Sequence, residues 1–531
     1  MTTPPDWTPR QWAVHVTHLE EQIAFLTQKV ETYEAYLRKD AHRQFGASSE
    51  RSDLEQLALA LFNEAEATAT PALAPATETI TYQRQKKTVG QREAQLAHLP
   101  VERITYELPE SDQTCEVCQN PLHVMSTEVR RELKVIPAQV TVIEHVQQIY
   151  SCRVCEHEAL TTPMKIAPAP RPVYPGSLLS ASLLADILHQ KFTQSVPLYR
   201  QSQEWARLGV ALSRQTLANW VVFGTHQWPE PLYQALHRAL LIQTLLQADE
   251  TPVQVLHEEG RKASQKSYMW LYRTGRDAPA IVLYDYQPSR GKEHPQAFLK
   301  GFRGMLQVDG YAGYHDLPDV VLAGCWAHAR RKYMDALKSL RASERDGPSL
   351  AREGVDFCNR LFAIERDLRD ASPEERLRAR QARSRPVLAQ FLRWLRTHRA
   401  ALIPQMPFGK AVTYCLNQWK PLTTFLQDGR LEIDNNRSER SIKPFILGRK
   451  NWLFANTPRG ARASAIAYSI IETAKENGLN PRAYLAYLFD QLPNQDLQDP
   501  TLWERYVPWS PHLPDSVKSP VLPGPTQHTR P

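Results

Sequence analysis

The sequence contains no long apolar run. Its apolar segments, such as LLSASLLADIL, fall short of the 18 or more residues that a membrane-spanning helix requires. The opening stretch, MTTPPDWTPRQW, also lacks the apolar core of a secretory signal. These absences exclude a membrane-spanning or secreted protein and predict a cytosolic one without a membrane partner.

The sequence also has few cysteines and a small net charge. Only seven of the 531 residues are cysteine, and Lys+Arg exceeds Asp+Glu by 64 − 57 = 7, with a pI near 8.9. This mild basic balance permits a polyanionic partner without requiring one. The 42% apolar content supports packed cores, and the length suits roughly three or four domains.

Four of the cysteines form two C-x2-C pairs with 33 residues between them, namely Cys115, Cys118, Cys152 and Cys155. Four thiolates on two tight turns suit tetrahedral Zn²⁺, whose binding energy can fold a module that has no large core. The segment between the pairs is rich in β-branched residues, which favours strands. We therefore expect a zinc-binding β module over residues 99–165.

The N-terminal region has apolar residues at alternating spacings of four and three. They are Trp12, Val16, Leu19, Ile23, Leu26, Val30, Tyr33 and Leu37. This heptad pattern predicts a coiled-coil helix over 10–45 and hence a homo-oligomer, although a helix packed on its own chain has the same pattern. Residues 46–98 are rich in Ala, Thr and Pro and then basic, which predicts a flexible basic linker.

Residues 170–240 have a helical pattern. In GVALSRQTLANWV, a turn at Gly209 precedes Ser213, a residue suited to cap the following helix. A DNA-binding helix-turn-helix has this form, and so does an ordinary helical pair. The segment is therefore a candidate for DNA binding only.

Two acids follow apolar segments that have the pattern of strands. Asp249 lies in LLQADETPVQVL and Asp309 ends GMLQVD, while KSYMWLYRT and AIVLYDY are typical of further strands. Carboxylates side by side at strand ends form a site for a hard cation such as Mg²⁺. Rival acids occur nearby, namely Glu250, Asp285, Asp316, Glu432 and Asp434.

A third acid, Glu439, lies in LEIDNNRSERSIKPFILGRKNWLF. Asn436 followed by Glu439 has the form of a capping box, so both residues can serve only to start a helix. Alternatively, Glu439 completes a set of carboxylates around two Mg²⁺ ions, which activate an attacking oxygen and stabilise a leaving one. The end of this stretch, GRKNWLF, is expected to be a strand or loop.

Helix formers and charges dominate the long interval between the second and third acids. Ser372, Pro373 and Glu375 predict a helix start within it, and we expect a helical insertion over 328–428. After the third acid, ARASAIAYSIIETAKENG predicts an amphipathic helix that ends at Gly478. Residues 491–531 are rich in proline and are expected to form an extended tail.

Several of these segments together resemble the insertion sequence 66 family of bacterial DDE transposases, over nearly the whole chain. They are RQFGASSER, CEVC with CRVC, PLYRQSQEWARLGVALSRQTLANWV, ADETPVQV, QVDGYAGY, GCWAHARRKY and DNNRSERSIKPFILGRKNWLFANTPRGARASAIAYSIIETAKENGLNP. The last block is long and highly specific.

The resemblance implies that Asp249, Asp309 and Glu439 form a catalytic triad that holds Mg²⁺ or Mn²⁺. The implied reaction is hydrolysis at the ends of a DNA element, followed by attack of the freed 3′-hydroxyls on target DNA. The implied fold class is multidomain α/β: the N-terminal coiled-coil helix, the zinc-binding β module, the helical segment and an RNase H-like catalytic domain. That domain comprises residues 241–327 and 429–490, interrupted by the α-helical insertion.

Cations surround the third acid and are expected to meet DNA phosphates. They are Arg437, Arg440, Lys443, Arg449 and Lys450, with Arg330 and Arg331 in the insertion as further candidates. Asn435 and Asn436 are expected to cap the helix of the third acid. Cys325 and His328 resemble a C-x2-H element of several transposase families, but two such residues favour packing of the insertion over a second zinc.

The implied partners are the terminal repeats of the element, target DNA and accessory proteins of the same element. The implied location is the bacterial cytoplasm, at the nucleoid. Two alternatives share much of this pattern. One is a zinc-dependent DNA-binding regulator with an inactive RNase H-like domain, which the presence of all three acids disfavours. The other is an RNase H-like nuclease that cuts DNA without joining strands.

Overall fold

The computed structural model describes residues 140–151, 164–340, 347–399 and 402–520, together with positions 16, 101, 103, 120 and 345. The four paired cysteines, the 46–98 linker and the heptad seam apart from Val16 lie outside the described residues. The chain divides into two compact units, Asn63–Ala169 with Ser519–Pro531, and Met1–Phe62 with Pro170–Lys518. Within the described part of the smaller unit, strand β1 (Ile149–Tyr150) pairs antiparallel with β2 (Lys165–Ile166).

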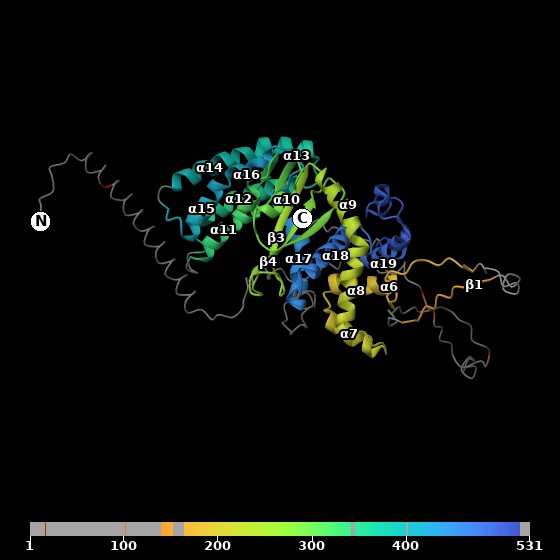
Figure 1. Cartoon of the computed structure of the whole chain (residues 1–531). Coiled ribbons are helices and arrows are strands. Elements are labelled where there is room, and N and C mark those ends of the chain that lie inside the picture. Colours follow the sequence, from red (N-terminus) through yellow and green to blue (C-terminus); the bar gives the residue numbers. More distant parts are fainter. Residues whose placement is uncertain are drawn as a thin grey trace, which may run out of the picture. The chain divides into compact units, whose positions relative to one another are not determined.

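The larger unit is built on one mixed five-stranded sheet with the order β5-β4-β3-β6-β7. Figure 1 labels β3 and β4 of this sheet. Its strands are β3 (Leu245–Gln254), β4 (Lys266–Thr274), β5 (Val282–Gln287), β6 (Gly304–Gln307) and β7 (Val320–Ala323). The first three strands pair antiparallel, whereas β3, β6 and β7 run parallel. The aromatic and β-branched segment KSYMWLYRT forms the whole of β4, as its composition predicts.

Helices from both ends of the unit share one hydrophobic core with the sheet. Before the sheet these are α6 (Ala181–Leu188), a π-helix (His189–Thr193), α7 (Leu198–Arg207), α8 (Arg214–Gln227) and α9 (Pro229–Leu241). After the insertion they are α17 (Asn436–Trp452), α18 (Pro458–Glu476) and α19 (Pro481–Gln491). Helix α17 packs on β3 and β4, and α18 packs on β5. The short α10 (Glu293–Phe298) links β5 to β6.

Local sequence signals explain several helix ends. The Ser213 side chain caps α8 by accepting a hydrogen bond from the Thr216 N–H at 3.0 Å. Gly209, in the turn before it, has φ of +82°, a conformation that favours glycine. Beyond α18, Gly478 has φ of +74° and stops the helix as predicted.

A helical region between β7 and α17 has its own hydrophobic core. Its helices are α11 (Trp326–Lys338), α12 (Leu350–Asp367), α13 (Pro373–Ala379), α14 (Arg385–Arg399), α15 (Pro407–Asn417) and α16 (Trp419–Thr423). A π-helix (Arg380–Ser384) joins α13 to α14. Ser372 and Glu375 form the predicted capping box at the start of α13. In Figure 1 these helices gather at one end of the sheet, away from α6 to α8.

Two expectations from the sequence are wrong. GRKNWLF is not a strand or loop, because α17 continues through it to Trp452. The region after residue 491 is not an extended tail as far as residue 520: it contains α20 (Trp503–Tyr506), and Trp503, Tyr506 and Leu513 are buried in the main core. Among the described helices, none is both long and apolar enough to cross a membrane.

Candidate functional site

The register of the sheet brings Asp249 and Asp309 together. Gln247 of β3 is the parallel partner of Gln307 of β6, and the two side chains share a hydrogen bond of 2.9 Å. Asp249 and Asp309 each follow two residues later. Because side chains alternate between the two faces of a strand, Asp249 lies on the same face as Gln247, beyond the end of β6. The sequence had suggested that Asp249 lies at the end of a strand, but it lies inside β3.

The electrostatics of Asp249 indicate a cluster of acids. Burial, then the negative charges of Glu250 and Asp309, raise the pKa of the Asp249 carboxyl well above its ordinary range, and Glu439 adds to the effect. Among the described residues, Asp249 and Asp309 form no ion pair. Asp249 Oδ1 accepts from the backbone N–H of Glu250 at 2.8 Å, and Asp309 Oδ1 accepts from that of Tyr311 at 2.9 Å. Clustered carboxylates without a cation fit the binding of divalent metal.

Buried Asn435 positions the helix that carries Glu439. Its side-chain amide donates to the Ala248 carbonyl of β3 at 2.9 Å, next to Asp249 in the chain. Asn436 instead donates to Asp434 at 2.7 Å, and neither asparagine side chain caps α17. The expected capping box of Asn436 and Glu439 is therefore absent. Glu439, in the first turn of α17, is left with its carboxylate available for other contacts.

The Glu439 carboxylate faces residues from the start of α11. Its Oε1 lies 3.7 Å from His328 Nδ1, and its Oε2 lies 3.9 Å from a guanidinium nitrogen of Arg331. Burial lowers the pKa of His328, while Asp309 and Glu439 act to raise it. The buried Cys325 thiol is also close, because its Sγ and atoms of His328 and Glu439 all lie within 4.8 Å of one another. The structure thus places a carboxylate, a third group of a kind that can ligate metal, beside the C-x2-H pair.

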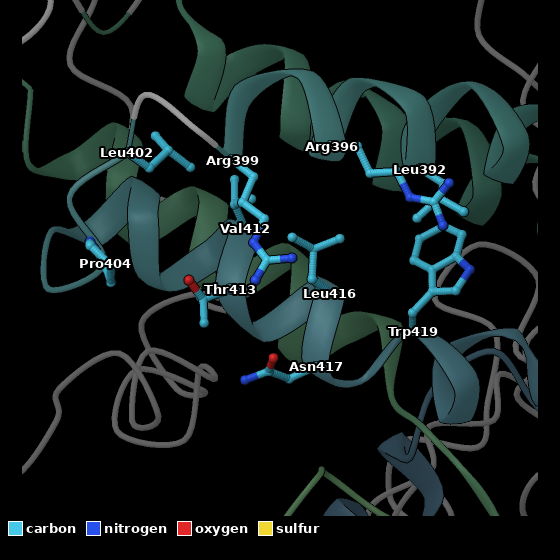
Figure 2. Close-up of a pocket in the computed structure, with 10 residues that line it drawn as sticks. All are labelled: Leu392, Arg396, Arg399, Leu402, Pro404, Val412, Thr413, Leu416, Asn417 and Trp419. Carbon is cyan, nitrogen blue, oxygen red and sulfur yellow. The ribbon is translucent and has the colours of Figure 1, made fainter.

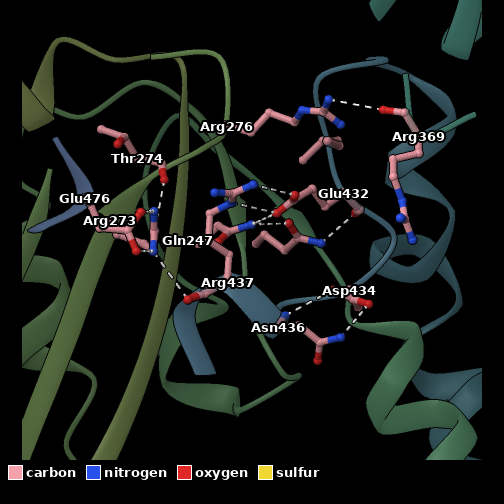
Figure 3. A network of polar contacts seen from close by, with 12 residues as sticks. Gln247, Arg273, Thr274, Arg276, Arg369, Glu432, Asp434, Asn436, Arg437 and Glu476 are labelled. Atoms are coloured by element: carbon pink, nitrogen blue, oxygen red, sulfur yellow. Dashed lines mark hydrogen bonds and ion pairs between the residues drawn. The ribbon is translucent and has the colours of Figure 1, made fainter. Parts of the chain in front are cut away.

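A network of polar contacts connects Gln247, Glu432 and Arg437 (Figure 3). Gln247 donates to Glu432 at 3.0 Å, and Gln307 donates to the Glu432 backbone carbonyl at 2.7 Å. Glu432 in turn pairs with Arg437 at 3.0 Å, which holds the pKa of Glu432 below its ordinary value against the effect of burial. Arg437, expected to contact DNA, is therefore engaged within the protein.

Each rival acid has a polar partner of its own. Glu250 pairs with Arg290 and accepts from the Tyr314 hydroxyl at 2.7 Å. The remaining four pairs are Asp285 with Gln287, Asp316 with Lys292, Glu432 with Arg437, and Asp434 with Asn436. The rival acids therefore differ from Asp249 and Asp309. Among the described residues, the carboxylates of Asp249 and Asp309 accept hydrogen bonds from backbone N–H groups alone.

The other predicted DNA-binding cations differ in exposure. Arg440 and Lys450 are exposed at the surface of α17, and Lys443 is half-buried. Arg449 donates to the Thr251 hydroxyl of β3 at 3.3 Å. In α11, Arg330 donates to Asn359 of α12 at 2.8 Å, and exposed Arg331 contacts His328 and Glu439. Arg331 and Arg449 are thus near the acids, whereas Arg330 joins two helices.

A separate cavity of about 440 Å³ opens between α14 and α15 (Figure 2). It has an apolar wall and two arginines, and it is lined by Leu392, Arg396, Arg399, Leu402, Pro404, Val412, Thr413, Leu416, Asn417 and Trp419. None of the three acids lines it, so it is not part of the carboxylate site.

Four family models match the chain. They are described as "Transposase IS66 family" over residues 176–463, "zinc-finger binding domain of transposase IS66" over 112–156, "IS66 C-terminal element" over 469–509 and "Transposase C of IS166 homeodomain" over 32–104. The second range contains all four paired cysteines.

The chain is also similar to curated proteins of Sinorhizobium fredii (strain NBRC 101917 / NGR234). It is 34% identical to "Uncharacterized protein y4jD" over 429 residues, which cover 78% of this chain and 80% of that protein. It is 32% identical to "Uncharacterized protein y4hP", over 77% of this chain and 74% of that protein.

These matches define the class of the protein as a transposase, an enzyme class that acts on DNA. More closely, the chain belongs to the IS66 transposase family.

Proposed function

We propose that this protein cleaves DNA at the ends of its insertion sequence and joins the freed 3′-hydroxyls to target DNA. Asp249, Asp309 and Glu439 serve as ligands of two Mg²⁺ or Mn²⁺ ions in an RNase H-like domain. The observation that carries the proposal is the cluster of carboxylates around Asp249: Asp309 lies two residues beyond the β6 partner of Gln247, and the charges of Asp309 and Glu439 both act to raise the pKa of Asp249. Bound ions supply activation of the attacking oxygen and stabilisation of the leaving oxygen.

The chain's own residues prepare this site. Burial and then the neighbouring carboxylates raise the pKa of Asp249, and bound cations would offset both effects, so metal and the deprotonated carboxylate stabilise each other. Asn435 holds the start of α17 against β3. Hydrogen bonds among Gln247, Gln307 and Glu432 link β3, β6 and the segment that leads into α17. These contacts fix the carboxylates before DNA arrives, which lowers the cost of organising the site during reaction.

DNA binding belongs to the same proposal. Exposed Arg440, Lys450 and Arg331, with Lys443 and Arg449, offer positive charge around the acids for flanking phosphates. Zn²⁺ bound by Cys115, Cys118, Cys152 and Cys155 folds the small module, and the heptad helix joins copies of the chain. Accessory proteins of the element complete the set of proposed partners.

The test is a cleavage and strand-joining assay on DNA that carries the element's own ends, in Mg²⁺. Glu439→Gln is expected to bind these ends but to lose cleavage by at least about 100-fold, because one metal ligand becomes neutral. Asp285→Asn is the matched control. This acid lies in β5, on the sheet that carries Asp249, but its carboxylate accepts a hydrogen bond from Gln287 at 2.8 Å. This variant is expected to cut and join as the wild type does.

The alternatives give different results in this assay. A wild-type protein that binds the ends and never cuts, with accessory proteins supplied, contradicts the proposal and favours a DNA-binding regulator. Cleavage without joined products favours a nuclease. Equal losses in Glu439→Gln and Asp285→Asn indicate general damage to the sheet and remove the support for Glu439 as a ligand.

A further inference from the structure

A second cluster of metal-ligating groups shares Glu439 with the carboxylate site. The sulfur of Cys325, the imidazole of His328 and the carboxylate of Glu439 come from the start of α11 and the first turn of α17, and their ligand atoms lie within 4.8 Å of one another. Cys325 is fully buried, whereas His328 and Glu439 are about one quarter exposed. The cluster is therefore largely preformed and still open to solvent on one side.

Two atoms of this cluster lack the partners that buried polar atoms require. His328 Nδ1 and Glu439 Oε1 are both buried, and neither has a hydrogen-bond partner among the described residues. They lie 3.7 Å apart, which is too long for a hydrogen bond but close to the spacing of two ligands on one metal ion. An unpartnered buried polar atom costs free energy, so two of them facing each other indicate a common ligand.

The donor set selects the class of ion. A thiolate, an imidazole and one carboxylate oxygen suit Zn²⁺ or Co²⁺, whereas Mg²⁺ takes oxygen ligands. Thiolate and carboxylate together carry two negative charges, which neutralise a divalent cation. Burial raises the pKa of the Cys325 thiol to about 12, and the backbone N–H of Asn435, which donates to Cys325 Sγ at 3.3 Å, opposes this effect in part. Three protein ligands leave a fourth position for water or a phosphate oxygen.

We propose that Cys325, His328 and Glu439 form a binding site for a divalent ion of the Zn²⁺ class. An ion at this site binds the Glu439 carboxylate and so competes with the catalytic metal ions for it. This competition rests on the proposed function. Binding breaks the S–H bond of Cys325, forms a metal–sulfur bond and releases one proton to solvent. The ion would thus act as an inhibitor of DNA cleavage.

Arg331 adjusts to the occupied site. One of its guanidinium nitrogens lies 3.5 Å from His328 Nε2, and another lies 3.9 Å from Glu439 Oε2. An ion on Nδ1 requires a proton on Nε2, which cannot then accept a hydrogen bond from Arg331. Arg331 is therefore expected to turn fully to the free oxygen of Glu439.

The binding test uses the full chain with its four-cysteine module loaded with Zn²⁺, to which Co²⁺ is added. A new thiolate-to-cobalt absorption band is expected, with about one additional ion per chain. Cys325→Ser should lose the band. Cys358→Ser is the matched control, because Cys358 is also fully buried in the helical region but is not part of the cluster. It should keep the band.

His328→Ala is a second variant, at a side chain that is about one quarter exposed. It is expected to weaken Co²⁺ binding by at least about 10-fold. Identical spectra for wild type and Cys325→Ser, or unchanged affinity in His328→Ala, would overturn the site and leave His328 as a group that orients Glu439. This test needs neither DNA nor activity, so its outcome is independent of the proposed function.

Competition is tested by adding Zn²⁺ to the DNA cleavage reaction in Mg²⁺. The Zn²⁺ concentration that halves the rate is expected to be at least about 10-fold higher for Cys325→Ser than for Cys358→Ser. Equal sensitivity of the two variants contradicts the inhibitory role. If the wild type does not cleave at all, the proposed function fails, while the cobalt result still decides whether the site exists.

Discussion

Asn435 joins the strand of the first acid to the start of the helix that carries the third. Replacing it with Ala leaves the buried Ala248 carbonyl without its donor at 2.9 Å, so we expect a loss of about 1–3 kcal/mol in the free energy of unfolding. Because the start of the helix that carries Glu439 is then no longer bonded to β3, DNA cleavage should fall as well. Both are measured on the purified variant, by urea unfolding and by the cleavage assay.

Asn436→Ala is the matched control for this prediction. Among the described residues, the Asn436 side chain hydrogen-bonds only to Asp434, in the loop that leads into α17, so its removal should cost less than about 1 kcal/mol. Equal effects at the two positions would show that the link to β3 has no special role.

Asp285 makes stability depend on pH in a specific window. Burial raises its pKa to about 6, from an ordinary value of 3.8. The folded state therefore holds this proton more tightly than the unfolded state, and stability falls as pH rises from about 4 to about 6. Asp285→Asn removes this loss, so above pH 6 it should be more stable than wild type by on the order of 2 kcal/mol.

The measurement is urea unfolding of both proteins at several pH values. The same substitution at exposed Asp370 provides the control and should leave the pH profile unchanged. A constant difference between wild type and Asp285→Asn across the window would contradict the raised pKa.

The sequence could identify the acids but not their surroundings. Apolar segments before Asp249 and Asp309 predict strands, yet only the register of β3 with β6 shows that the two acids are neighbours. Nothing in the spacing of Cys325 and His328 points to Glu439, which follows more than a hundred residues later. Likewise, Asn436 has the pattern of a cap, but Asp434 lies close enough to take its amide.

At the scale of elements, Arg380 links the helical region to the segment that leads into α17. It is fully buried in the π-helix between α13 and α14 and forms two hydrogen bonds with Glu365, at 2.7 and 2.8 Å. It also donates to the backbone carbonyls of Phe425, Asp428 and Leu431. Arg380→Met leaves Glu365 unpaired and three carbonyls without donors, so we expect a cost of about 3–5 kcal/mol.

Thermal or urea unfolding measures this cost, and cleavage should fall with it because the approach to Glu439 loosens. Arg378→Met, at an exposed position two residues earlier, should change stability by less than about 0.5 kcal/mol. An Arg380→Met protein as stable as the control would show that the buried cation is dispensable.

Helix α17 shows why element ends were hard to predict. Pro444 and Gly448 favour a break after the third acid, and the basic aromatic stretch that follows has the composition of a strand. Tertiary packing overrides both signals, because Ile442, Phe445 and Gly448 form the buried face of one continuous helix. Glycine is needed at 448, where a Cβ would come within 2.3 Å of the Tyr468 hydroxyl.

At the scale of the whole molecule, the C-terminal segment completes the main core. Leu502, Trp503, Tyr506, Leu513 and Val517 are all at least 94% buried there. A chain that ends at residue 499 should lose at least about 5 kcal/mol, since burial of one large apolar side chain contributes about 1.5–3 kcal/mol. A chain that ends at residue 520 keeps these contacts and is the control, with both compared by thermal unfolding.

The proline content of this segment explains why the sequence predicted an extended tail. Proline disfavours long helices but is compatible with short turns and caps, and the segment folds as short helices that place large side chains against α19. Composition alone does not reveal that contact, because the partner surface lies in other elements.

The order of the acids along the chain has a consequence for the timing of activity during synthesis. After Asp309 has been synthesised, the ribosome must add 439 − 309 = 130 residues to reach Glu439. The contact of α17 with β3 joins residues far apart in sequence, so it cannot form until the intervening helices have been synthesised. A nascent or prematurely terminated chain that ends before residue 439 therefore lacks one of the three acids proposed as metal ligands.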